Sequence, residues 1–154
     1  MCIRDRISYG LARSERARND DSSYRLFDFD QTHVFTALAS YEIGAGFEVG
    51  TRFRLSSGFP RTAVTGAYFV SRTDSYEPLF AGQNEDRLPT FVQLDVRLSK
   101  KFDLGAVDLE AYLDVQNVTH HQNVEEIVYS DDYSESGAIT GVPILPVVGL
   151  RSSW

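Results

Sequence analysis

The chain has 154 residues and a formal net charge of −7, with a sequence pI near 4.9 and a mean hydropathy of −0.25. This acidic balance argues against a general nucleic-acid-binding protein, which needs a basic face to neutralise phosphates, so no nucleic-acid partner is expected. The single cysteine, Cys2, excludes an intrachain disulfide. No apolar run approaches the roughly 20 residues of a transmembrane helix, but a transmembrane β-barrel can have this hydropathy because only half of each strand faces lipid.

The first six residues, MCIRDR, stand apart from the rest of the chain. They resemble the translated end of a sequencing-library adapter, and we interpret residues 1–6 as a non-native segment. The sequence near them has no apolar secretion signal, so the protein is either cytoplasmic or its true beginning is missing. Ile7, Tyr9 and Leu11 then alternate with small or polar residues, which indicates the end of a strand. The charges and turn formers of residues 13–31 predict a solvated loop.

Two alternating segments between residues 32 and 56 predict an antiparallel pair of strands. Most odd positions of 32–43 are apolar, and the same parity continues in 47–55. The even-numbered positions of the second segment carry Glu48, Arg52 and Arg54. A tight turn over the glycine-rich residues 44–46 joins the two strands.

A long connection from residue 57 to about residue 88 is marked by glycine and proline, and we expect a short hairpin near 67–70 within it. The clearest alternation of the chain follows in 91–102 and again in 107–116. A short turn at 103–105 joins these segments, so they predict a long hairpin with one apolar and one charged face. Residues 119–141 form a second long, acidic connection, with a strand-like stretch at 127–129, and a last strand is expected near the C-terminus.

The connections therefore alternate between short and long along the chain. Outer-membrane barrels have short turns on the periplasmic side and long loops outside, whereas a soluble sandwich has no reason to sort its loops by length. This pattern favours an all-β fold, an antiparallel transmembrane β-barrel fragment of about six meander strands with short periplasmic turns and long extracellular loops.

Aromatic residues on the apolar parity lie at the strand ends next to the short turns. They are Tyr41, Phe47, Phe102 and Trp154. Amphipathic rings favour the membrane interface, and this position was not required by the alternation itself. The aromatics therefore predict a periplasmic aromatic girdle in contact with outer-membrane lipid.

The polar parity of the same strands carries charges that are candidate site residues. They are Arg52, Arg54, Asp95, Arg97, Asp108, Glu110 and Asp114. In a soluble sheet these charges would lie on the solvent-exposed face. In a barrel they line the lumen, where opposite charges on neighbouring strands can pair. We expect these charges to pair across strands or to contact a part of the protein enclosed by the barrel, and direct contact with a solute in the lumen is the alternative.

Other polar groups carry weaker signals. His120 and His121 are neighbours that point opposite ways in an extended chain, which makes a shared metal ion awkward. The acidic residues of 131–135 do not have the spacing of an EF-hand calcium loop. No catalytic triad, phosphate-binding glycine loop or Walker motif is recognisable, so no enzymatic activity, cofactor or metal is expected.

Several of these segments resemble the C-terminal end of the barrel of bacterial TonB-dependent receptors. The matching pieces are FDFDQTHVFTALASYEIG, FEVGTRFRLSSGFP, RLPTFVQLDVRLSKKF, LEAYLDVQNV and GVPILPVVGLRSSW. The resemblance implies a bacterial outer-membrane transporter with about 22 strands closed around an N-terminal plug. Residues 7–154 would then be the C-terminal part of such a barrel, with the plug domain and the remaining strands absent.

The last residues also resemble the C-terminal signal that the barrel-assembly machinery reads. Gly149, Leu150 and Trp154 carry this resemblance, whereas Ser152 departs from the apolar residue usual at its position. A last strand that ends in an interfacial aromatic can also hydrogen-bond to the first strand of a barrel and close it.

The family resemblance implies transport of a scarce solute, of the siderophore-iron, cobalamin or glycan class, energised by the TonB complex acting on the plug. Two alternatives stay open. The chain could belong to a passive porin-type channel, or it could be a soluble β-sandwich that binds a ligand through its long loops.

Overall fold

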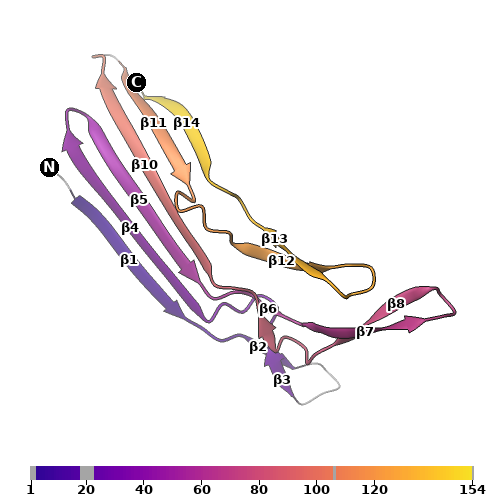
Figure 1. Ribbon diagram of the computed structural model, residues 1–154. Helices are drawn as coiled ribbons and strands as arrows, with labels where there is room; N and C mark the ends of the chain where they lie inside the picture. The colour runs from indigo at the N-terminus through magenta and orange to yellow at the C-terminus, as the bar shows by residue number, and fades with distance from the viewer. Residues whose placement is uncertain (1–2, 18–22, 106, 154) are drawn as a thin grey trace.

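Six long strands form one antiparallel sheet in the order β1-β4-β5-β10-β11-β14 (Figure 1). The computed structural model describes residues 3–17, 23–105 and 107–153, and every regular element among them is a β-strand. The long strands are β1 Ile3–Leu11, β4 His33–Gly44, β5 Phe47–Ser56, β10 Phe91–Asp103, β11 Asp108–Gln116 and β14 Leu145–Ser153. The described residues contain no helix with the length and apolar character needed to cross a membrane.

Four two-stranded sheets lie in the connections between the long strands. They are β2 Glu15–Ala17 with β3 Tyr24–Leu26, β6 Pro60–Arg61 with β9 Asp86–Arg87, β7 Val64–Val70 with β8 Ser75–Phe80, and β12 Val124–Tyr129 with β13 Ser136–Thr140. Figure 1 shows all of them beyond the same end of the large sheet, with the β7–β8 and β12–β13 hairpins projecting from it. The turns β4–β5 and β10–β11 lie at the opposite end. The sorting of short and long connections is therefore present in the fold.

In the strand register, apolar residues of one strand mostly lie opposite apolar residues of the next strand. On β5 and β10, Phe53 pairs with Leu94 and Val49 pairs with Leu98. Leu98 pairs in turn with Leu113 of β11, which pairs with Val148 of β14. Because neighbouring residues in a strand point to opposite faces, this register gives the sheet one apolar and one charged face.

The sheet is open among the described residues. β1 pairs only with β4, and β14 pairs only with β11, so the two outer strands each have an edge without a hydrogen-bonding partner there. All nine residues of β1 are exposed. Ile3–Arg6, within the segment interpreted as non-native, belong to β1, and Ile3 pairs with Tyr41.

Most of the buried side chains are polar. Among the described residues Pro60 of β6 is the one apolar side chain that is buried. The buried polar side chains are Asp30, Asn84, Asp95, Ser99, Asn117 and Asn123. Large apolar side chains are open to the surroundings, such as Ile7 at 69% and Leu150 at 72% relative exposure. The structure is therefore a single layer whose apolar face is covered by no second layer of the described chain.

The expected strands at 32–43, 47–55, 91–102 and 107–116 are confirmed, as is the short hairpin near 67–70, which is longer than expected as β7–β8. The expected solvated loop over 13–31 also contains a short antiparallel pair, β2 with β3, whose residues are mostly exposed and which the sequence did not predict. The strand-like stretch 127–129 is part of β12, and β13 is its partner.

Candidate functional site

Asp95 is the centre of the polar network on the charged face. It lies on β10 directly opposite Arg52 of β5, and only 6% of its side chain is exposed. Arg52 donates two hydrogen bonds to Asp95 Oδ2, from Nε at 2.9 Å and from Nη2 at 2.7 Å. Oδ1 accepts hydrogen bonds from Gln93 Nε2 at 2.7 Å and from the backbone N–H of Asn117 at 2.9 Å. Since Asn117 follows β11, one carboxylate connects β5, β10 and the end of β11.

The other two arginines predicted as site residues also have polar or ring contacts on this face. Arg97 Nη2 donates to Glu110 Oε1 at 3.2 Å, and its guanidinium carbon lies 4.0 Å from the centre of the Tyr112 ring. Arg54 Nη2 donates to Gln93 Oε1 at 2.8 Å, whereas its buried Nε has no hydrogen-bond partner among the described residues.

Two of the predicted charges are not engaged. Within the described part of the chain, Asp108 and Asp114 form neither a hydrogen bond nor an ion pair through their side chains. An open concavity of about 490 Å³ lies over this part of the sheet. Its charged lining includes Arg4, Arg6, Arg52, Asp95, Arg97 and Asp114. The surface could therefore receive a polar solute or a polar polypeptide segment through charges of both signs.

Tyr112 and Gly149 lie directly opposite each other on β11 and β14. A Cβ atom added to Gly149 would lie 2.3 Å from Tyr112 Cζ and Oη, because the tyrosine ring occupies the space above the glycine. The residue interpreted as part of the assembly signal thus also has a packing reason to be small. Leu150, on the other face, is open, and Trp154 lies outside the described residues.

The short-turn end of the apolar face carries the other predicted girdle residues. Tyr41 lies opposite Val49, Phe47 lies opposite Lys100, and Phe102 lies opposite Leu109. Lys100 shares the apolar face, and its Nζ is 4.4 Å from the centre of the Phe47 ring and 5.0 Å from that of Phe102. Lys100 was not among the predicted site residues, although it has the same parity on β10 as Leu98 and Phe102.

One carboxylate also occurs on the apolar face. Asp5 of β1 pairs with Ala39 of β4, which pairs with Thr51 of β5, so it lies well away from both ends of the sheet. It belongs to the segment interpreted as non-native, and its position fits that interpretation, which stays a prediction.

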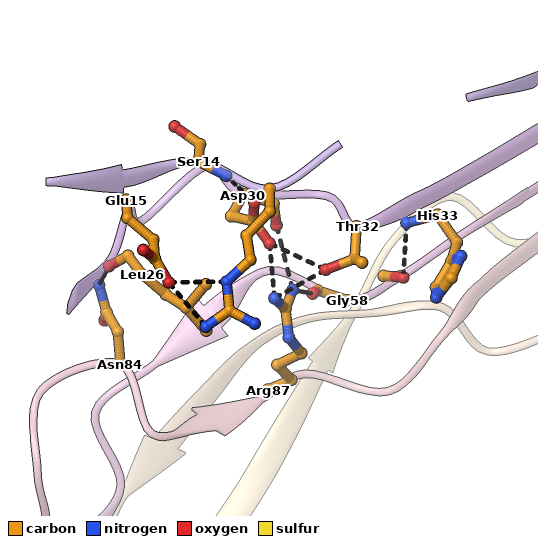
Figure 2. Close-up of polar contacts among 11 residues, drawn as sticks. Ser14, Glu15, Leu26, Asp30, Thr32, His33, Gly58, Asn84 and Arg87 are labelled. Atoms are coloured by element: carbon orange, nitrogen blue, oxygen red, sulfur yellow. Dashed lines mark hydrogen bonds and ion pairs between the residues drawn. The ribbon is translucent and has the colours of Figure 1, made fainter. Parts of the chain in front are cut away.

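Asp30 and Arg87 hold the long-loop end of the sheet together (Figure 2). Arg87 Nη2 lies 2.5 Å from Asp30 Oδ2, and only 1% of the Asp30 side chain is exposed. Arg87 also donates to the backbone oxygens of Asp30 at 3.2 Å and Gly58 at 3.0 Å, while Ser14 N–H and Thr32 Oγ1 donate to the Asp30 carboxylate. Burial alone would raise the pKa of Asp30, but these hydrogen bonds outweigh it and lower the pKa below its ordinary 3.8.

Three buried asparagines attach other loop segments. Asn123 accepts a hydrogen bond from Val92 N–H at 2.8 Å and donates to Val92 C=O at 2.9 Å, so its amide replaces a strand partner beside β10. Asn117 Nδ2 donates to the carbonyl oxygens of His121 and Val142. Asn84 Nδ2 donates to the carbonyl of Leu26 at 2.7 Å and joins β3 to the β8–β9 connection. These hydrogen bonds hold in place connecting segments whose composition alone would predict loops.

The polar groups of the outer connections serve local structure. Asp132 accepts hydrogen bonds from the Ser130 and Ser134 hydroxyls, and these lower its pKa to about 2. His120 Nδ1 accepts a long hydrogen bond from Ile144 N–H at 3.4 Å. No group of three or more His, Cys, Asp or Glu side chains within residues 3–17, 23–105 and 107–153 is arranged to hold a metal ion.

Comparisons with known proteins give no further constraint on this site. No protein-family model, curated protein or solved structure matches the chain.

Proposed function

We propose that the chain is the C-terminal barrel wall of a bacterial outer-membrane transporter of the TonB-dependent class. The observation that supports this most directly is the apolar face, which the register continues across all six strands while no described residue covers it. Soluble proteins rarely expose a contiguous apolar patch larger than a few hundred Å². Lipid is a solvent in which such a face is stable.

The two edges of the sheet support a larger barrel. Unpaired N–H and C=O groups cost several kcal/mol each in hydrocarbon, so spanning sheets close on themselves. β1 and β14 would pair with the remaining strands of the same protein, and β14 would be read by the barrel-assembly machinery through Gly149, Leu150 and Trp154.

The charged face would line the lumen. Two ion pairs join neighbouring strands on this face, Arg52 with Asp95 and Arg97 with Glu110. The carboxylates of Asp108 and Asp114 remain available to a plug or a solute. In this proposal the TonB complex acts through the plug to energise uptake of a scarce solute of the siderophore-iron, cobalamin or glycan class.

Spin labels on adjacent residues of β11 test the membrane placement. In a Cys2→Ser background, Leu113→Cys and Asp114→Cys place one label on each face of the same strand. In phospholipid vesicles the label at 113 should relax strongly with oxygen and weakly with a water-soluble nickel chelate, and the label at 114 should show the reverse. A soluble β-sandwich predicts exclusion of both agents at 113 and a monodisperse protein in water without detergent. That outcome would contradict the proposal.

A second measurement separates energised transport from a passive porin. Reading the genomic frame upstream of codon 7 should show a plug domain and a TonB-contact segment. Their absence, together with passive flux of small solutes through reconstituted vesicles, would instead support the porin-type channel.

A further inference from the structure

Lys100 is a cation on the apolar face of the sheet. Its side chain shares this face with Leu98 and Phe102, because all three have the same parity on β10. Its partners across the register are Phe47 on β5 and Ala111 on β11. No carboxylate occupies a neighbouring position on this face, and within the described residues Lys100 forms no ion pair.

Lys101 provides the contrast within the same strand. It points to the charged face, where its Nζ lies 3.6 Å from Glu48 Oε2. Two consecutive lysines therefore differ in face and in partner. The charge of Lys101 is compensated by the protein, whereas that of Lys100 is not.

The surroundings of Lys100 fit an anion that comes from outside the protein. Its ammonium lies between two aromatic rings, at 4.4 Å from the centre of Phe47 and 5.0 Å from that of Phe102. These rings contact the cation and hold its apolar stem, but they do not neutralise its charge. Ala111, on the other flank, has a small side chain, and Lys100 as a whole is partly exposed.

We infer that Lys100, held between Phe47 and Phe102, binds the phosphate of an anionic phospholipid at the short-turn end of the sheet. An uncompensated ammonium at the edge of hydrocarbon is costly, and the phosphate layer is the nearest source of negative charge. Phe47 and Phe102 then contact the acyl chains of the bound lipid while Lys100 reaches its headgroup. This site rests on the proposed membrane function and adds a lipid class to it.

Vesicle binding of the full chain tests the inference. The probes are vesicles of phosphatidylcholine alone and vesicles with phosphatidylglycerol added, and the measured quantity is the ratio of the two binding constants. Lys100→Gln should lower this preference about fivefold, the effect of one lysine near a charged membrane surface. Lys101→Gln is the matched control, since it removes the same charge one residue away. It should lower the preference clearly less than Lys100→Gln, because Glu48 already compensates the charge of Lys101.

The outcomes are distinguishable. If the chain inserts and both variants lower the preference equally, the attraction is general surface charge and the site is refuted. The site is also refuted if neither variant changes the preference. It is refuted as well if adding inorganic phosphate abolishes the preference, because the contact is then one with free phosphate. If the spin label at 113 shows no lipid exposure in either vesicle, the proposed function fails independently of Lys100.

Discussion

The side chains of Arg52 and Asp95 meet across β5 and β10, with both guanidinium contacts falling on the same carboxylate oxygen of Asp95. The second oxygen serves Gln93 and the backbone of Asn117. Asp95 is therefore a junction of three strands, and its removal affects more than one ion pair.

Replacing Asp95 by alanine should destabilise the folded chain by about 2 kcal/mol, because several donors lose their acceptor at once. Arg52→Ala should cost less, since the arginine side chain is 45% exposed and its loss is partly compensated by solvent. The measurement is urea unfolding in detergent micelles, followed by circular dichroism. Asp114→Asn is the control, and its effect should stay within about 0.5 kcal/mol. Equal losses for Asp95→Ala and Asp114→Asn would show that Asp95 is not a junction.

Gly149→Ala should destabilise the pairing of β11 and β14 by roughly 1–3 kcal/mol, because the new Cβ overlaps the ring of Tyr112. Gly66→Ala is a matched control in β7, since a Cβ there meets nothing within 4 Å. Urea unfolding of both variants checks this. Adding Tyr112→Ala should relieve the defect of Gly149→Ala, and a defect that persists in the double variant would point instead to backbone strain.

The stability of the long-loop end should fall in acid. The pKa of Asp30 is lowered in the folded state, so its contribution is complete above the ordinary carboxyl value of 3.8 and is lost as the pH falls through the lowered folded pKa. Carbon-13 NMR of the aspartate carboxyl groups should show Asp30 titrating below 3.8. Asp30→Asn should reduce the acid dependence of the urea midpoint, and Asp131→Asn, at an exposed loop position, should reduce it less. A normal titration of Asp30 would contradict this account.

Asp5→Leu should stabilise the chain in phospholipid vesicles by about 1 kcal/mol, since the carboxylate lies on the apolar face, at the level of the middle of β4 and β5. The same substitution at Arg4, which lies on the opposite face, should not stabilise it. Urea unfolding from vesicles measures both. A destabilising effect of Asp5→Leu would mean that this part of the face does not contact lipid.

The large sheet could be predicted from sequence because alternation reports directly on strand faces. Leu94, Val96 and Leu98 define one face of β10 by parity alone, and the short turn after them fixes their antiparallel partner. The same reasoning located the charges of the polar face, but not their pairing. Whether Arg97 meets Asp114 or Glu110 depends on side-chain reach, and the structure pairs it with Glu110, although Asp114 is its register partner.

Apart from the hairpin near 67–70, the loop hairpins could not be fully predicted because contacts distant in sequence order them. Asp30 and Arg87 are 57 residues apart, and no local pattern links them. The pairing of the Asn123 side chain with the backbone of Val92 could not be predicted either, since an asparagine in a polar connection ordinarily suggests a turn. The β2–β3 and β12–β13 pairs were missed or only half recognised for this reason.

The polar character of the buried side chains reverses the usual pattern of mutational tolerance. In a globular protein, volume changes in apolar side chains are costly and polar surface positions accept most residues. Here Val148 and Leu150 pack against no layer of the described chain, so exchanges among leucine, isoleucine and valine should be nearly neutral there as long as the residue remains apolar. The strict shape requirements fall on Asp30, Asn117 and Asn123, where aspartate and asparagine are not interchangeable because each position has a fixed set of donors and acceptors.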